Sequence, residues 1–180
     1  MKSFLMTVTA LCSLGACNRP DPMEANLDNA LTNVAANDAV PVAGIVVFTF
    51  IKEAIQGDNA EIALGELAQS QGDSQKVKDF GKMLAQDHSA HKQELASFAE
   101  SAAVPVTDDL TTKGKTDLEK LKTLSGAEFD KQFKAMMIDH HTAEIARYEA
   151  RATSSDAELA ALAKKTLPVL RRHLEAAKAL

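Results

Sequence analysis

The chain has 180 residues, of which 46% are hydrophobic, 4% aromatic and 25% charged, and its formal net charge is -5 at pH 7. An acidic chain without basic runs argues against binding to nucleic acid, and against binding to an anionic membrane surface through a basic helix. The length suits one domain whose core is built from aliphatic side chains and a few phenylalanines.

The first residues have the pattern of an export leader. Lys2 precedes a mostly apolar run over residues 4–11, too short to anchor a protein across a bilayer, and Leu14-Gly15-Ala16-Cys17 follows. The last four residues resemble the lipobox of bacterial lipoproteins, in which the cysteine is lipidated and begins the mature chain. The resemblance implies a signal peptide over residues 1–16 and a lipid anchor on Cys17. An ordinary cleaved signal peptide with an incidental cysteine is the alternative.

The leader also sets the expected location. Asn18 after the cysteine is similar to the signal that sorts lipoproteins to the outer membrane. We therefore expect a periplasm-facing lipoprotein of the cell envelope whose membrane partner is reached through Cys17. Cys12 lies in the leader, so the mature chain has no free thiol and any metal ligand must be nitrogen or oxygen. The sequence names no protein partner and permits a homo-oligomer.

Composition divides the rest of the chain in two. Residues 17–43 are rich in Asn, Asp, Ala and Pro with little periodicity, which predicts a flexible tether. Residues 44–180 are rich in Ala, Leu, Glu and Lys, which predicts a helical domain. Its breaks predict long helices near residues 45–70, 74–102, 127–153 and 155–179, and a short connecting helix near 109–124.

Local signals refine these elements. Ser125-x-x-Glu128 and Ser155-x-x-Glu158 have the capping-box pattern and predict the starts of the last two long helices. Pro168 is expected to kink or locally break the last one. Residues 45–51 could form a strand, but no second strand-like run is present to pair with it. We predict an all-α fold, an antiparallel four-helix bundle in a single domain.

Histidines and carboxylates lie on the apolar stripes of the predicted helices. Residues three or four apart on the third long helix are Phe129, Phe133, Met136 or Met137, His140, Glu144 and Tyr148. The second long helix similarly carries His88 and His91, the last carries His173, and the first carries Glu61. The spacing places the fifth histidine, His141, to the side of its helix.

In an antiparallel bundle these side chains can meet. With a rise of 1.5 Å per residue, His88 and His140 lie near the middle of their helices, and Glu61 and His173 lie within about two turns of that level. We predict a divalent metal site with His88, His140 and His173 as primary ligands, Glu61 and Glu144 as carboxylate ligands, and His91 as an accessory ligand. Asp87 and Asp139 are expected either to hydrogen-bond the ligands from behind or to be solvated.

Two other interpretations stay open. Each buried histidine can be a neutral core residue, in a non-catalytic structural or stress-related envelope protein. Burial without a shared partner would cost about 1–3 kcal/mol for each histidine, which favours the metal site. A metal-dependent oxidoreductase rests on fold analogy alone. The sequence contains no nucleophile elbow, phosphate loop, dinucleotide fingerprint or His-Glu-x-x-His, so no reaction is predicted.

Five separated blocks carry a family resemblance, namely Ala60–Ala68, Met83–His88, Leu124–Asp130, Met137–His140 and Thr166–Leu174. In this order they resemble the bacterial envelope family catalogued as domain of unknown function 4142. The resemblance implies a ferritin-like bundle, often secreted or lipid-anchored, without an established activity. Residues 137–141 are also locally similar to the Met-Ile-x-His-His motif of small periplasmic helical proteins, some of them linked to copper.

The ligand types bear on the ion. Ferritin-like carboxylate enzymes place a Glu on each of two helices and Glu-x-x-His on the other two. This chain has no Glu-x-x-His, since Ala85 and Leu170 stand three residues before His88 and His173. Dinuclear iron chemistry is therefore doubtful, and a histidine-rich site better suits one Zn²⁺, Cu²⁺ or Ni²⁺ ion. The identity of the ion, iron included, stays open.

Overall fold

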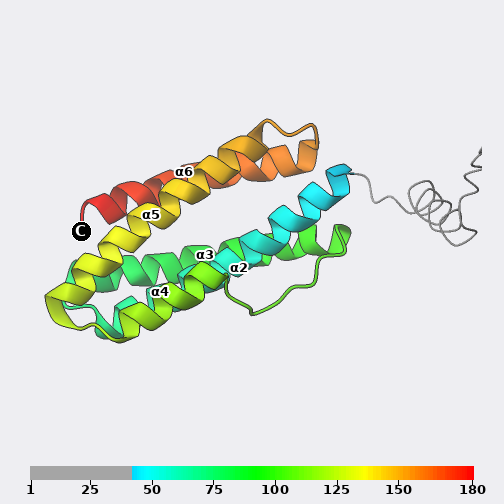
Figure 1. Cartoon of the computed structure of the whole chain (residues 1–180). Helices are drawn as coiled ribbons and strands as arrows, with labels where there is room; N and C mark the ends of the chain where they lie inside the picture. Colours follow the sequence, from blue (N-terminus) through cyan, green and yellow to red (C-terminus); the bar gives the residue numbers. More distant parts are fainter. Residues whose placement is uncertain (1–41) are drawn as a thin grey trace, which may run out of the picture. The chain divides into compact units, whose positions relative to one another are not determined.

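The structure is a computed structural model that describes residues 42–180. The predicted signal peptide (1–16), the predicted lipidation site Cys17, and the predicted tether (17–43) up to residue 41 lie outside the described residues. Within residues 42–180 the chain forms five helices and no strand, which confirms the all-α prediction there (Figure 1). None of these five helices is long and apolar enough to cross a membrane.

Four of the helices are long and one is short. The long ones are α2 (Val42–Gln71), α3 (Gln75–Ser101), α5 (Gly126–Ala152) and α6 (Ala157–Lys178), and the short α4 (Thr112–Lys122) lies between α3 and α5 in the chain. These bounds lie close to the predicted ones. Residues 45–51, which could have formed a strand, are part of α2.

The start of α3 shows how polar side chains set a helix boundary. Ser74 Oγ accepts the backbone N–H of Val77 at 3.3 Å, as an N-cap does. The carboxylate of Asp130 in α5 accepts the backbone N–H groups of Asp73 and Ser74, each at 2.8 Å. The turn between α2 and α3 is therefore held by a side chain from α5.

Neither predicted capping box forms as expected. Ser125 precedes α5, but its hydroxyl makes no cap hydrogen bond to any described residue. Gly126, the first residue of α5, has a φ of 59°, a left-handed conformation that glycine adopts readily. The cap of α6 is Asp156 rather than Ser155, because the Asp156 carboxylate accepts the N–H of Leu159 at 2.9 Å.

The alternative of a local break at Pro168 is wrong, since α6 is one continuous helix from Ala157 to Lys178. Proline lacks the N–H that would bond the carbonyl of Lys164, four residues earlier. Both Pro168 and Lys164 are exposed. The unpaired carbonyl therefore lies on the solvent side of the helix, where water can hydrogen-bond to it.

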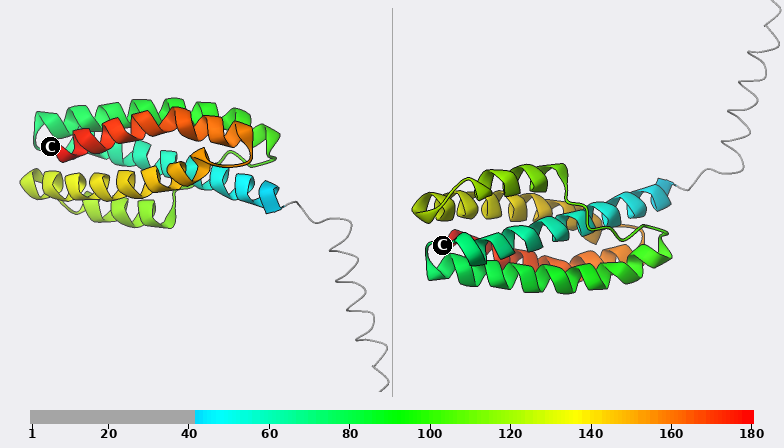
Figure 2. Two further views of the ribbon diagram at one scale, coloured as in Figure 1. Left: turned by 90° about the horizontal axis from the view of Figure 1, so that it is seen from above. Right: turned by 90° about the horizontal axis from the view of Figure 1, so that it is seen from below.

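The long helices pair as two hairpins. α2 packs along α3, and α5 packs along α6 (Figure 1). Contacts between the two hairpins are sparser than contacts within them. Both views of Figure 2 show α4 on the outside of the domain, where it contacts α2 and α5.

Two apolar clusters fill the interior, and a polar layer separates them. One cluster includes Phe50, Ile55, Leu95, Tyr148, Leu162 and Leu170, and the other includes Leu64, Leu84, Phe129, Phe133, Met137 and Ala177. Each long helix passes from one cluster to the other through buried polar residues. These are Asp58 and Glu61 on α2, His88 on α3, His141 on α5 and His173 on α6. The functional site is expected in this layer, because burying so many polar groups needs a compensating partner.

Two facing glycines allow α2 and α3 to approach closely. A Cβ atom on Gly65 would lie 2.5 Å from the backbone oxygen of Gly81, and a Cβ on Gly81 would lie 2.6 Å from that of Gly65. A side chain at either position must therefore push the helices apart. Gly57 on α2 differs, since a Cβ there would meet no described atom within 4 Å.

We expect Gly81→Ala to lower the free energy of unfolding by about 1–3 kcal/mol, as overpacking does, although Ala favours a helix by about 1 kcal/mol. Gly57→Ala is the matched control, in which the helix propensity acts alone and raises stability by up to about 1 kcal/mol. Urea unfolding followed by circular dichroism measures both changes. Effects of the same sign would contradict the close contact at Gly81.

Candidate metal centre

Three imidazole rings meet in the polar layer. His88 of α3, His141 of α5 and His173 of α6 are buried, and one ring nitrogen of each lies within 4.8 Å of one ring nitrogen of each of the others. The ring centroids are 5.2 to 5.9 Å apart. Both hairpins therefore contribute to one cluster, which we call the three-histidine cluster.

An acceptor behind each ring determines which nitrogen faces the cluster. The contacts are His88 Nδ1 to Asp58 Oδ1 at 2.8 Å, His141 Nδ1 to the Met137 carbonyl oxygen at 2.9 Å, and His173 Nε2 to Asp87 Oδ2 at 2.8 Å. Each of these ring nitrogens carries a proton and donates a hydrogen bond to its acceptor. His88 Nε2, His141 Nε2 and His173 Nδ1 are left to face the cluster. Outer hydrogen bonds of this kind orient the histidines of metal sites.

Two of the inner nitrogens face each other without a proton between them. His141 Nε2 and His173 Nδ1 are 3.3 Å apart, and both present lone pairs because the protons are on the opposite nitrogens. Two imidazoles on a tetrahedral Zn²⁺, with Zn–N bonds of about 2.0–2.1 Å, have their nitrogens about 3.3–3.4 Å apart. The pair is therefore spaced like two ligands of one ion, and His88 offers a ring nitrogen within 4.8 Å of one from each of the other two residues.

The charges around the cluster differ from ring to ring. Burial lowers the pKa of His173 to about 4, and its hydrogen bond to Asp87 offsets only part of this effect. Burial also lowers the pKa of His88, but the hydrogen bond to Asp58 and the charges of Asp58 and Glu144 outweigh it and raise the pKa to about 9. His173 is therefore neutral at neutral pH, and a metal ion has to displace a proton from His88.

Asp58 holds two imidazoles from one buried position. Its Oδ1 lies 2.8 Å from His88 Nδ1, and its Oδ2 lies 2.9 Å from His91 Nδ1. Burial raises the pKa of Asp58, but the hydrogen bonds to the two histidines lower it below the usual value, so the carboxylate is ionised. The Nε2 atom of His91 lies 3.3 Å from both Tyr148 Oη and Thr166 Oγ1. His91 is thus beside the three-histidine cluster and linked to it through Asp58.

His140 belongs to a separate cluster. Its Nδ1 is 2.6 Å from Glu61 Oε1, and its Nε2 is 2.6 Å from Asp117 Oδ2. Burial lowers the pKa of His140, but the hydrogen bonds to the two carboxylates raise it overall. With a carboxylate at each nitrogen the ring is held as an imidazolium, which has no lone pair for a metal ion. It joins α5 to α2 and α4.

The structure reverses the directions expected for the adjacent residues His140 and His141. His141, expected at the side of its helix, is 0% exposed and faces His88 and His173, whereas His140 faces α2 and α4. The spacing argument assumed that this helix buries a single stripe. Because α4 covers a second side of α5, residues on both sides are buried, as the neighbours Met136 and Met137 show.

The other predicted site residues differ in how they relate to the three-histidine cluster. Glu61 Oε2 is buried without a hydrogen-bond partner among residues 42–180, and its charge acts on His88. Glu144 is half-buried, burial raises its pKa, and its charge also acts on His88. Asp87 hydrogen-bonds a histidine of α6 rather than its neighbour in sequence, and Asp139 is exposed.

Sequence reasoning missed two carboxylates, Asp58 and Asp117. Asp58 lies four residues after Ala54 and three before Glu61, so it shares their stripe on α2, and this spacing could have revealed it. Asp117 lies in a short, mostly polar helix. There no pattern distinguishes it from a solvated aspartate.

The Glu61–His140 pair makes stability depend on pH. Burial raises the pKa of Glu61, but the hydrogen bond to His140 and the charge of His141 lower it from 4.5 to about 2. Its contribution is present above pH 4.5 and is lost as the pH falls toward about 2. The raised pKa of His140 has the opposite effect. That contribution is present below pH 6.5 and is lost as the pH rises through the folded-state pKa.

We therefore compare the free energy of unfolding of the wild type with that of His140→Gln. The wild type should be more stable, and the difference should be largest between about pH 4.5 and about pH 6.5. Urea unfolding of both proteins from about pH 3 to about pH 9 measures this difference. The wild-type advantage should shrink on both sides of the window. An advantage that is constant across this range would mean that His140 is not an imidazolium between two carboxylates.

Comparison with known proteins adds the family. The model described as "Domain of unknown function (DUF4142)" matches residues 33–180. The chain belongs to the DUF4142 family. The five-block resemblance predicted this membership, which is confirmed, and the family description assigns no function. No curated protein matches the DUF4142 chain.

Among solved structures, the DUF4142 domain is similar to the "Crystal structure of DUF305 fragment from Deinococcus radiodurans". The TM-score is 0.65 at 13% sequence identity, and the match covers 74% of this chain and 93% of that chain. At this identity the likeness shows a shared helical fold. The chemistry of the DUF4142 site has to be argued from its own residues.

The donor set of the DUF4142 cluster fits a borderline divalent ion. Imidazole nitrogens suit zinc, copper, nickel and iron, whereas calcium and magnesium prefer oxygen ligands. Three protein nitrogens are also fewer than the four ligands of a closed structural zinc site. The arrangement can therefore hold an ion that keeps an open position.

Proposed function

We propose that this protein binds one divalent transition-metal ion, such as Zn²⁺ or Cu²⁺, through His88, His141 and His173. The observation that carries the proposal is the 3.3 Å approach of two ring nitrogens, His141 Nε2 and His173 Nδ1, that both present lone pairs. The third inner nitrogen, His88 Nε2, is buried and has no hydrogen-bond partner in the described part of the chain. A metal ion that accepts the lone pairs would replace this unfavourable contact with coordination bonds.

Carboxylates complete the proposed site. Glu61 Oε2, which no described group hydrogen-bonds, is available as a fourth ligand or as an acceptor for metal-bound water. Glu144 is the second candidate carboxylate, because its charge reaches His88. Asp58 and Asp87 orient the ligand rings from outside, and the Asp117–His140 pair holds Glu61 in place.

Elemental analysis of the untagged mature protein and calorimetric titration with Zn²⁺ and Cu²⁺ test the proposal. We expect about one ion per chain, release of about one proton per ion, and a Tm that rises with ion concentration. A protein that contains no ion, binds neither in titration and gains no thermal stability would refute the metal site.

A purely structural role is the second candidate, and His140 is the observation that favours it. Its two nitrogens bridge carboxylates from two other helices, so one buried histidine already serves stability. If this holds for the whole layer, the protein is a non-catalytic envelope protein. Histidine substitutions would then change unfolding free energy only, with no response to added ion.

We infer that the four long helices form an antiparallel bundle of the ferritin-like type. The hairpins α2–α3 and α5–α6, and two apolar clusters to which all four helices contribute, support this arrangement. A crystal structure of the mature protein tests it. Hairpins that pack end to end rather than side by side would refute it.

We also propose that a lipid on Cys17 attaches the domain to the periplasmic face of the outer membrane. The support is the leader over residues 1–16 and its Leu14-Gly15-Ala16-Cys17 ending. Cys17→Ser should move the protein from the membrane fraction to the soluble fraction of the envelope. A wild-type protein already found in the soluble fraction would overturn this proposal.

A further inference from the structure

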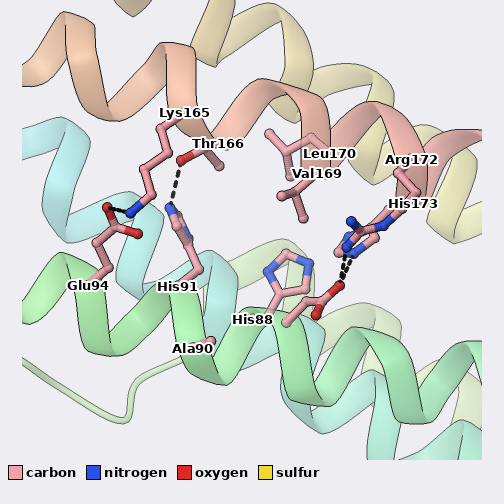
Figure 3. Close-up of a pocket in the computed structure, with 11 residues that line it drawn as sticks. His88, Ala90, His91, Glu94, Lys165, Thr166, Val169, Leu170, Arg172 and His173 are labelled. Carbon is pink, nitrogen blue, oxygen red and sulfur yellow. Dashed lines mark hydrogen bonds and ion pairs between the residues drawn. The ribbon is translucent and has the colours of Figure 1, made fainter.

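A pocket between α3 and α6 opens onto the three-histidine cluster (Figure 3). Its volume is about 200 Å³. His88 and His173 line one part of it, Val169 and Leu170 the middle, and His91 and Thr166 the far part. Two of the three proposed ligand rings therefore form part of its wall.

The pocket has room for a molecule beside the ion. A buried water needs only about 10–15 Å³ of such space, so the volume far exceeds that of one water. An ion with three imidazole ligands also keeps an open position for an exogenous ligand. A small molecule can thus enter between α3 and α6 and reach a coordination site.

His91 is positioned to contact such a molecule. Its Nδ1 is fixed at 2.9 Å by Asp58, the carboxylate that also orients His88. Its Nε2 is therefore an acceptor and lies 3.3 Å from the Tyr148 hydroxyl. The Thr166 hydroxyl is also 3.3 Å from Nε2, but it donates to the Leu162 carbonyl oxygen at 3.0 Å. His88 and His91 are three residues apart on one helix, which places their Cβ atoms about 5–6 Å apart. A ligand of two or three atoms that is bound to the ion beside His88 is therefore long enough to reach His91.

The open coordination position selects the class of ligand. Lys165 pairs with Glu94 at 2.7 Å and Arg172 pairs with Asp87 at 2.6 Å, so the charges that border the pocket cancel in pairs. Inside, the two positive charges of a divalent ion face the carboxylates of Asp58, Glu61 and Glu144, so no excess charge selects a cation or an anion. The ion therefore selects its ligand by coordination, as a Lewis base.

We propose that the pocket between α3 and α6 is a binding site for a small Lewis base, which enters beside Val169 and coordinates the ion. This inference rests on the proposed metal site and adds its ligand class. Azide is a suitable probe, because it is a Lewis base of three atoms and gives a charge-transfer band on Cu²⁺.

The experiment titrates azide into the Cu²⁺-loaded mature protein and follows that band. We expect saturable binding by the wild type. Val169→Phe, which fills the middle of the pocket, should weaken azide binding by about tenfold or more and change Cu²⁺ affinity by less than about twofold. Val106→Phe is the matched control at a loop position that is 52% exposed, and it should bind azide like the wild type.

A second filling variant guards against a folding failure. Ala90→Phe narrows the pocket from an exposed lining position and replaces Val169→Phe if that variant does not fold.

The outcomes distinguish this inference from the metal site itself. Failure of the wild type to bind either Cu²⁺ or Zn²⁺ would overturn the proposed function and the pocket together. Bound Cu²⁺ without an azide band would overturn the pocket alone. Equal azide affinity in the wild type and in a folded filling variant would also overturn the pocket alone.

Discussion

His141→Gln is expected to reduce the affinity for Zn²⁺ or Cu²⁺ by more than about 100-fold. Losing only a hydrogen bond that orients a ligand costs up to about 100-fold, and losing the ligand itself should cost more. The substitution removes the imidazole whose Nε2 lies 3.3 Å from His173 Nδ1, and only two histidine ligands remain. Isothermal titration calorimetry measures the affinity of the variant and of the wild type.

His140→Gln is the matched control, because it places the same substitution on the neighbouring residue. It should weaken ion binding by no more than about tenfold, because all three imidazole ligands remain and only the contact that holds Glu61 is lost. It should instead lower the free energy of unfolding by about 3–5 kcal/mol, since Glu61 and Asp117 lose the imidazolium between them. If His140→Gln lost the ion and His141→Gln kept it, the ligand assignment would have to follow the sequence spacing instead.

Asp58→Asn is expected to have the second largest effect. Asp58 is 0% exposed, and its two oxygens accept hydrogen bonds from His88 Nδ1 and His91 Nδ1. An amide has one oxygen, so its NH₂ group would face the N–H of one ring. We expect ion affinity to fall by about 10–100-fold and unfolding free energy to fall by about 3 kcal/mol or more.

Asp108→Asn serves as the control for that substitution. The Asp108 side chain is 99% exposed and pairs with Lys92 at 2.8 Å. We expect wild-type ion affinity and no measurable change in stability, because exposed pairs contribute little. Calorimetry and urea unfolding give both quantities for each variant. A wild-type ion affinity in Asp58→Asn would show that this carboxylate does not orient a ligand.

The helices could be predicted from the sequence because their signals are local. Apolar residues three or four apart, and breaks such as Gly72-Asp73, determine where α2 ends and α3 begins. The capping residue of α6 was harder to predict. Ser155 and Asp156 are both good N-caps, and the choice depends on how the preceding turn is folded.

The site could be predicted in its composition but not in its pairing. His88 and His173 stand out because a histidine on an apolar stripe needs a partner. Whether His140 or His141 joins them depends on where α4 packs, which no local pattern contains. The Asp87–His173 hydrogen bond likewise requires the relative register of α3 and α6, which only tertiary packing determines.

The division of the domain into two sparsely connected hairpins has a consequence for its dynamics. The proposed ligands come from both, with His88 on one hairpin and His141 and His173 on the other. A bound ion would be a removable cross-link between them. Chelation should then speed amide hydrogen exchange along the seam between the hairpins more than within either one. The supply of metal in the surroundings would set how rigid the protein is.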